Sequence, residues 1–293
     1  MIPQFQVLLN GIISGALYAL IACGISIIYL INKFYHFAHG GIITTAAYLL
    51  FLFYSMLKYN LIISIVISIV FSTFIGYSLD LIVYREFRKR KTGNITLLIA
   101  GFAMLVIFES FIIMLFGADV KVIGFFEFQK VIDIYGLLIS PLQMYIIFLS
   151  IFLLFSTHYL LQYTKIGKTM RAVSSNYEIA ETLGISSERI YSFSMIVGSI
   201  IGAVAGLLIG LEQNIEPIFG SNLMIKGFTS VIIGGSDSLS GAILGAFFLG
   251  VIENFVVWYL SPVYKDIITF FLLFIFLIFK PEGILGIKKG VKL

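Results

Sequence analysis

Long apolar runs alternate with short polar stretches along almost the whole chain. The apolar runs cover approximately residues 7–31, 37–57, 61–84, 95–117, 138–162, 190–211, 241–260 and 264–279. A helix of about 20 apolar residues spans the roughly 30 Å hydrocarbon core of a bilayer. The runs are continuous, whereas the strands of a membrane barrel alternate apolar and polar positions. The pattern therefore predicts an all-α polytopic membrane protein, with residues 1–293 forming a single transmembrane domain.

Composition agrees with this interpretation. Of the 293 residues 60% are hydrophobic and 12% are charged, and the mean hydropathy is +1.06. Soluble domains carry about twice that share of charge. The one cysteine, Cys23, excludes an intrachain disulfide. The first run follows MIPQFQ, which has no Lys or Arg, so a cleaved secretory signal is not expected. We expect a multi-pass protein of the cell membrane.

Basic residues gather in three groups between the apolar runs. The groups are Arg85, Arg88, Lys89, Arg90 and Lys91; Lys165, Lys168, Arg171 and Arg189; and Lys280, Lys288, Lys289 and Lys292. The positive-inside rule places all three groups in the cytoplasm. Because they lie in loops between membrane segments, they do not indicate a nucleic-acid partner.

A count of crossings then predicts a further element. The chain must cross an even number of times between Arg189 and Lys280, yet only three full runs lie there. The remaining apolar stretch, 223–238, contains Gly234 and Gly235 and is short, so it is expected to be a broken or re-entrant helix. Irregular backbone at membrane depth is tolerated against protein or a water-filled cavity, so this stretch is a candidate for the translocation pathway. The prediction is about eight full transmembrane helices plus one broken segment, N-out and C-in.

The run that begins near residue 37 starts with HFAHGG, which contains His39, Gly40 and Gly41. A helix that begins inside the protein can direct its free N–H groups at a ligand carboxylate, and interrupted helices mark substrate paths in transporters. These three residues are therefore pathway candidates. A simple cytoplasmic turn is the alternative.

Glu109 lies well inside the fourth apolar run. An ionisable group at that depth costs about 2.5–3.5 kcal/mol on insertion scales, so it should face the bundle or a cavity. A hydrogen-bonded packing role is favoured, and a proton relay in the pathway is the alternative. Glu253 is interpreted in the same way.

Glycines recur every four residues at Gly198, Gly202, Gly206 and Gly210. This spacing forms a ridge that lets another helix backbone approach closely. We expect helix packing at this ridge.

No motif indicates an enzyme, a cofactor or a metal. Gly167-Lys168-Thr169 resembles the end of a phosphate-binding loop, but Gln162 stands where that loop needs glycine and no strand precedes it. His36 and His39 have no third metal ligand with suitable spacing nearby. Nucleotide binding by this chain is not expected.

The polar stretch 163–189 interrupts the apolar pattern. Its charges and small residues predict a short helix and a turn in the cytoplasm, where Gly184 would end the helix in a left-handed conformation. The sequence TKIGKTMRAVSSNYEIAETLGISSERI resembles the cytoplasmic loop of permeases in the branched-chain amino acid class of ABC importers. The matching positions are Gly167, Arg171, Ala172, Ala180, Gly184 and Ile185.

Three further stretches carry the same resemblance, in the same order. They are GIISGALYALIACGISIIYLI, FAHGG and KGFTSVIIGGSDSLSGAILGAFFLGVIE. The chain departs from the family at His36, where asparagine is usual, and at Glu109, where a neutral amide is frequent.

The resemblance implies a permease subunit of an ATP-driven, binding-protein-dependent importer. Its partners would be a related second permease, two cytoplasmic ATPase subunits and an extracellular solute-binding protein. The stretch 163–189 would be the loop that couples the permease to the ATPases. Branched-chain amino acids are the expected solutes, and urea or another small solute is the alternative. An ion-coupled secondary transporter is the rival class, and it would place coupling on Glu109.

Overall fold

The computed structural model describes residues 2–124, 131–134 and 136–286. Two compact units are each built from separate stretches of the chain. The first comprises Met1–Ser26, Glu127–Leu154 and Ile225–Leu293, and the second comprises Ile27–Phe126 and Phe155–Met224. The third basic group lies partly outside the described residues.

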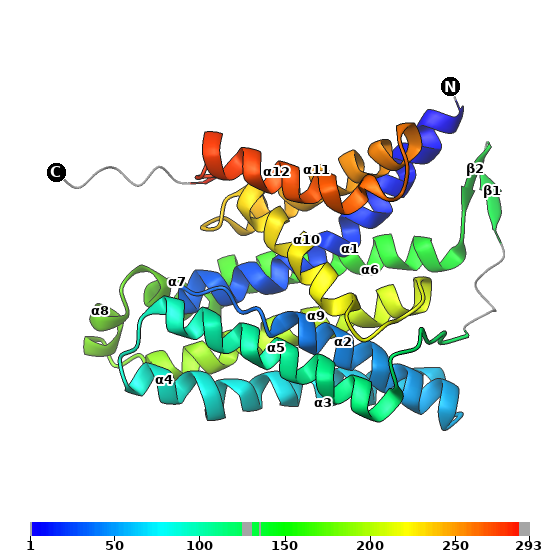
Figure 1. Cartoon of the computed structure of the whole chain (residues 1–293). Helices are drawn as coiled ribbons and strands as arrows, with labels where there is room; N and C mark the ends of the chain where they lie inside the picture. The colour runs from blue at the N-terminus through cyan, green and yellow to red at the C-terminus, as the bar shows by residue number, and fades with distance from the viewer. Residues whose placement is uncertain (1, 125–130, 135, 287–293) are drawn as a thin grey trace. The chain divides into compact units, whose positions relative to one another are not determined.

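Helices dominate both units (Figure 1). In chain order the helices are α1 (Ile2–Asn32), α2 (His39–Leu50), η1 (Phe51–Met56), α3 (Leu61–Leu79), η2 (Asp80–Tyr84), α4 (Arg85–Lys89), α5 (Asn94–Phe116), α6 (Pro141–Tyr163), α7 (Lys165–Ser175), α8 (Tyr177–Thr182), α9 (Ser187–Glu212), α10 (Phe219–Gly234), α11 (Leu239–Tyr259) and α12 (Tyr264–Phe279). Strands β1 (Ile132–Ile134) and β2 (Leu137–Ile139) form one antiparallel hairpin. Within the described residues, 7 helical segments are long and apolar enough to cross a membrane.

The second unit is organised around α2, which packs against α3, α5 and α9. The predicted glycine ridge on α9 forms part of this contact. Gly202, Gly206 and Gly210 lie opposite His39, Ile43 and Ala47, respectively. Both series advance by four residues in the same direction, so α2 and α9 run parallel. The close approach requires glycine, because a Cβ on Gly206 would collide with the Ile43 backbone.

Glycines also allow close packing in the first unit. Gly11 and Gly15 of α1 lie against Val251 and Phe247 of α11, so these helices run antiparallel. At the other end of α11, Gly241 meets the backbone of Gly234 at the end of α10.

Three local features differ from the sequence-based expectations. The stretch 223–238 was expected to be broken, but α10 is unbroken from Phe219 to Gly234 and the interruption lies in the following turn. The runs 37–57 and 61–84 each end in a π-helical segment, η1 and η2, which apolar periodicity does not indicate. A hairpin precedes α6 in a chain predicted to be all-α.

Candidate functional site

The polar stretch 163–189 folds as two short helices at the same end of the second unit as α4 (Figure 1). Side chains cap the start of each helix. The Thr164 hydroxyl accepts a hydrogen bond from the Gly167 N–H at 3.0 Å, and the Asn176 side chain accepts one from the Ile179 N–H at 3.1 Å. Such caps satisfy N–H groups that a helix start leaves free. The stretch is therefore an ordered helical segment, hereafter the α7–α8 segment.

Gly184 ends α8 in the left-handed conformation, with φ +82°. The Ile185 N–H donates to the Ala180 carbonyl at 3.0 Å, and the Gly184 N–H donates to the Glu181 carbonyl at 2.9 Å. This pair of bonds is a Schellman motif, in which glycine avoids the steric cost of positive φ. The helix stop predicted at Gly184 is confirmed.

Several of the predicted coupling residues face the chain itself. Gly167 lies against the Leu160 and Leu161 carbonyls, and the Arg171 guanidinium donates to the Leu161 carbonyl. Ala180 is only 2% exposed, on a helix that contacts both α7 and α9. A bulky residue at position 180 would therefore disturb the packing of α8 within this chain. Ala172 and Ile185 are half-buried, and Gly184 is exposed.

Large apolar side chains are exposed on α8 and at the residue that caps its end, which the sequence interpretation missed. Tyr177 is 50% exposed, Ile179 59% and Leu183 74%. Ile166 of α7 is also exposed. The hydrogen bond from the Tyr177 hydroxyl to Glu178, and the charge of Glu178, raise the pKa of Tyr177. The available signal was the presence of large apolar residues at Ile179 and Leu183 within an otherwise polar stretch.

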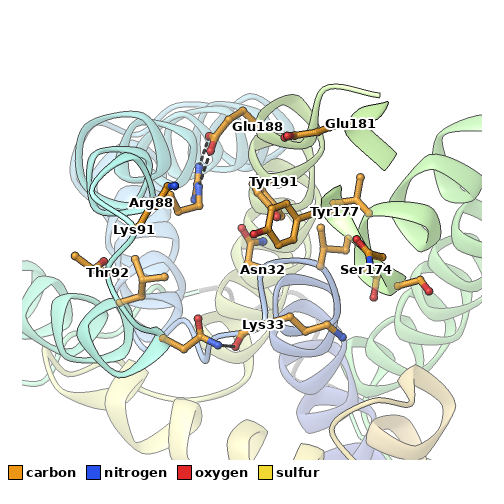
Figure 2. A pocket seen from close by; sticks show the side chains of 16 residues that line it. Asn32, Lys33, Arg88, Lys91, Thr92, Ser174, Tyr177, Glu181, Glu188 and Tyr191 are labelled. Carbon is orange, nitrogen blue, oxygen red and sulfur yellow. Dashed lines mark hydrogen bonds and ion pairs between the residues drawn. The ribbon is translucent and has the colours of Figure 1, made fainter. Parts of the chain in front are cut away.

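A cavity of about 670 Å³ lies beside the α7–α8 segment (Figure 2). Its walls come from the end of α1, the turn between α4 and α5, the α7–α8 junction and the start of α9. Figure 2 shows Arg88 and Glu188 joined on one wall, with Tyr177 and Ser174 on another. Arg88 and Lys91 of the first basic group thus share one cavity with residues of the α7–α8 segment, and the sequence assigns both regions to the same side of the membrane.

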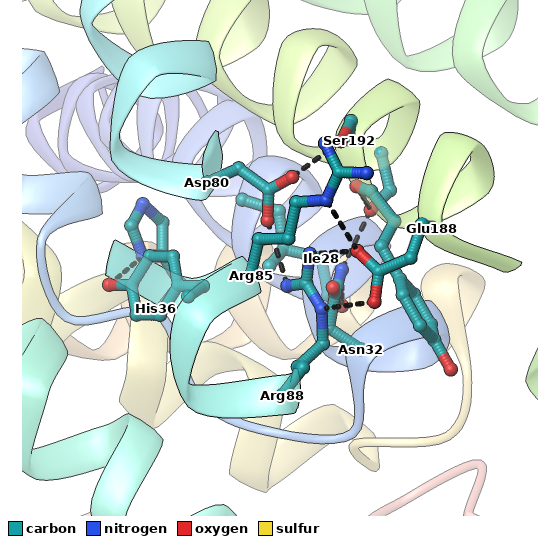
Figure 3. Close-up of polar contacts among 11 residues, drawn as sticks. Ile28, Asn32, His36, Asp80, Arg85, Arg88, Glu188 and Ser192 are labelled. Atoms are coloured by element: carbon teal, nitrogen blue, oxygen red, sulfur yellow. Dashed lines mark hydrogen bonds and ion pairs between the residues drawn. The ribbon is translucent and has the colours of Figure 1, made fainter. Parts of the chain in front are cut away.

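Arg88 lies at the centre of an ionic network that joins buried Asp80 to the partly exposed Glu188 (Figure 3). Its Nη1 donates to Oδ1 of Asp80 at 2.8 Å, while Nε and Nη2 donate to the two oxygens of Glu188 at 3.2 and 2.8 Å. The Ser192 hydroxyl donates to the other oxygen of Asp80 at 2.5 Å. Asp80 is fully buried, and the Arg88 guanidinium lies 5.0 Å from the centre of the Tyr191 ring. Such bidentate arginine–carboxylate pairs fix geometry as well as charge.

Further polar contacts join α1 to the same region. The Asn32 side chain donates to the Ser194 hydroxyl at 2.7 Å, and the Ser174 hydroxyl donates to the Leu30 carbonyl at 2.6 Å. In the loop after α1, His36 shares a hydrogen bond of 2.8 Å with the Tyr84 hydroxyl. Burial, reinforced by nearby His39, lowers the pKa of His36 well below its ordinary value, so this imidazole is neutral near pH 7.

The structure brings four predicted pathway residues together in the second unit. His39 begins α2 against Gly202, Gly40 lies against Gly220, and Gly41 lies against Phe108. His39 is fully buried, and neither ring nitrogen has a hydrogen-bond partner among the described residues. Glu109 is half-buried one residue beyond Phe108, and it accepts a hydrogen bond from the hydroxyl of Ser221.

The other two pathway candidates, Gly234 and Gly235, have mainly backbone neighbours in the first unit. Gly234 meets the backbone of Gly241, and Gly235, at φ +111°, lies against Glu282 and Gly286. The Leu285 N–H donates to the Gly234 carbonyl at 2.9 Å. These contacts give the two glycines a clear packing role at the turn after α10.

Apolar helices long enough to span a bilayer, together with an ordered polar helical segment, define a helical membrane protein. The chain matches the family described as the branched-chain amino acid transport system permease component over residues 7–277. It belongs to that family of importer permease subunits, and membership implies association with ATPase and binding-protein components.

Similar curated proteins cover nearly the whole chain. The high-affinity branched-chain amino acid transport system permease protein BraD of Pseudomonas aeruginosa is 30% identical, covering 96% of this chain and 95% of its own length. The high-affinity branched-chain amino acid transport system permease protein LivH of Escherichia coli (strain K12) is also 30% identical, with the same coverage of both chains. A solved structure, PsaBC from Streptococcus pneumoniae in complex with Fab, shares the fold with a TM-score of 0.50 at 12% identity, covering 93% of this chain and 91% of that one.

Proposed function

We propose that this chain is the membrane permease subunit of an ATP-driven importer for branched-chain amino acids, and that the α7–α8 segment docks on the ATPase subunits. The observation that carries the proposal is the exposure of two large apolar side chains four residues apart, Ile179 on the capped, ordered helix α8 and Leu183 directly after it. Adjacent exposed apolar side chains on an otherwise polar segment are typical of a protein-binding surface. The names of the relatives support the solute class.

The proposed assembly contains a related second permease, two cytoplasmic ATPases and an extracellular solute-binding protein. The permease pair would be either a heterodimer or a homodimer. Gly184, Gly167 and Arg171 shape the α7–α8 segment, whereas Ile179 and Leu183 make the contact. These three residues thus contribute to docking through the conformation of the segment.

The proposed topology has the N-terminus outside and the C-terminus inside, with about eight full spans. Support comes from α1, which is one continuous helix whose last turn contacts Ser174 and Ser194 near the α7–α8 segment. If that segment is cytoplasmic, α1 begins on the outer side. Helix α10, at 16 residues, is about 24 Å long and serves as the short crossing.

We assign the solute pathway to the region around the start of α2. A buried imidazole with unpartnered nitrogens costs free energy unless something compensates it, which favours a functional role for His39. Gly40, Gly41 and Glu109 lie in the same unit. Within this importer class, urea or another small solute is the alternative cargo.

Replacing Leu183 with aspartate tests the docking proposal. A central interface residue can contribute about 2 kcal/mol or more, so Leu183→Asp should weaken ATPase retention about thirtyfold. Thr182→Asp is the matched control, because it adds the same charge on an exposed neighbour. Uptake into proteoliposomes and retention of ATPases in pull-downs would be measured. Full retention and full uptake in Leu183→Asp would refute the docking role.

A further inference from the structure

One arginine joins two helical segments that meet beside the α7–α8 segment. Arg88 of α4 makes one hydrogen bond to Asp80 and two to Glu188. The side chain of Arg88 is 12% exposed and that of Asp80 is fully buried. This is a more constrained contact than the surface pairs of the same helix, in which Glu86 bonds to exposed Lys89 and Arg90.

The two carboxylates each lie near the start of a helical segment. Glu188 is the second residue of α9 and follows Ile185, the last residue of the Schellman motif, by three positions. Asp80 opens η2, which continues α3 without a break. Displacement of the α7–α8 segment therefore reaches Glu188 through only a few residues of backbone, and reaches α3 through Arg88.

Both connected helices pack against α2. Helix α9 places Gly202 against His39, and α3 places Gly76 against Ser199 and Ile42. Since packed interiors resist deformation and transmit displacement, an ionic joint between α3 and α9 would make the two helices move together around the start of α2.

We propose that Arg88 is a positioning residue for transport, which links the α7–α8 segment to the helices that surround the start of α2. The inference rests on the proposed function of the α7–α8 segment. Arginine is suited to this position because its planar fork holds two carboxylates at once, with Tyr191 beneath it. A lysine ammonium is a single point charge and cannot reproduce that arrangement.

Two variants separate positioning from stability. Arg88→Lys keeps a cation for buried Asp80, so the protein should still fold, but it loses the two-point contact with Glu188. Glu188→Gln keeps the shape of the side chain and leaves the Arg88–Asp80 ion pair intact, but it removes the negative charge at position 188. Glu86→Gln is the matched control, because it makes the same chemical change on α4 at an exposed pair.

The complete complex, with its ATPases and binding protein, would be reconstituted in proteoliposomes. Solute uptake, ATP hydrolysis, ATPase retention and melting temperature would be measured for each variant. In Arg88→Lys and Glu188→Gln, uptake per ATP hydrolysed should fall at least about tenfold, the scale of one lost charge-assisted bond. ATPase retention should stay at the level of the unsubstituted complex, and Glu86→Gln should change none of these quantities.

The outcome identifies which proposal fails. An unchanged ratio of uptake to ATP hydrolysis in both variants, even with a lower melting temperature, overturns the positioning role and leaves a structural ion pair. Failure of the docking proposal would be seen in a different variant, because Leu183→Asp would then retain its ATPases fully.

Discussion

The ammonium of Lys226 and the carboxylate of Glu253 form a buried ion pair at 3.3 Å, between α10 and α11 of the first unit. Glu253 is fully buried and also accepts hydrogen bonds from the hydroxyls of Tyr18, at 2.7 Å, and Thr269. Lys226 makes a second ion pair with Asp266 at 3.1 Å. Four helices therefore contribute to one charged cluster, and its polar atoms satisfy one another.

Breaking this pair on one side should destabilise the protein strongly. Lys226→Met leaves the Glu253 charge buried without its main partner, which costs about 3–5 kcal/mol in comparable pairs. Lys226→Met/Glu253→Gln should recover most of that loss, because the amide oxygen still accepts from Tyr18 and no buried charge remains. Unfolding in detergent with increasing denaturant measures both free energies.

Asp266→Asn is the control for this prediction. Asp266 is 67% exposed, so its pair with Lys226 should contribute no more than about 1 kcal/mol. If Lys226→Met/Glu253→Gln is as unstable as Lys226→Met, the uncompensated charge of Glu253 is not the cause of the lost stability.

Gly184 offers a test of backbone conformation without a steric change. A Cβ at this position would meet nothing within 4 Å, so the cost of replacement comes from φ +82° alone. Gly184→Val should cost about 1–3 kcal/mol locally and displace the neighbouring Leu183. Gly184→Asn should be tolerated, because asparagine adopts this conformation more readily. ATPase retention and uptake measure the effect.

The matched control is Gly93→Ala. Gly93 also has open space around its Cβ position, but its φ is −69°, which any residue adopts. Normal uptake in Gly184→Val would mean that the α7–α8 segment needs no defined end.

Local patterns in the sequence predicted the elements whose cause is local. Helix spans follow from continuous apolar runs, and α12 begins and ends at the predicted residues, 264 and 279. The stop at Gly184 depends on one residue and its neighbours. The ridge on α9 followed from a four-residue spacing, because that spacing puts the glycines on one helix face.

Features that depend on distant partners could not be predicted in the same way. Arg88 and Glu188 are 100 residues apart in sequence, and many other charged pairs were equally possible. Ala180 is small enough for a protein groove or for the interior, and only packing against α7 and α9 decides between them. The π-helical segments also depend on tertiary packing.

The proposed topology predicts that the two ends of α10 lie on opposite sides of the membrane. In a Cys23→Ala background, Ile218→Cys should react with an impermeant thiol reagent from outside. Ser240→Cys should react only from the cytoplasmic side. Both positions are exposed and lie close to the helix ends. Labelling of both residues from the same side would show that α10 does not cross, and it would remove the parity argument for the C-terminal half.

Glu109 is predicted to act through its hydrogen bond and not through a proton. It is half-buried in α5 and accepts a hydrogen bond from the hydroxyl of Ser221. Glu109→Gln preserves an acceptor oxygen in the same place, so uptake and its dependence on pH should stay within about twofold of the unsubstituted protein. Glu109→Leu removes the acceptor and leaves the Ser221 hydroxyl without it, so uptake should fall by about fivefold or more for a loss of roughly 1 kcal/mol.

Ser221→Ala is the partner control, because it removes the same hydrogen bond and leaves the carboxylate. Uptake in reconstituted complexes between pH 5.5 and 8, with ATP hydrolysis measured in parallel, distinguishes the alternatives. If Glu109→Gln abolishes uptake or flattens its pH profile while ATP hydrolysis continues, Glu109 carries a proton and the packing role is wrong.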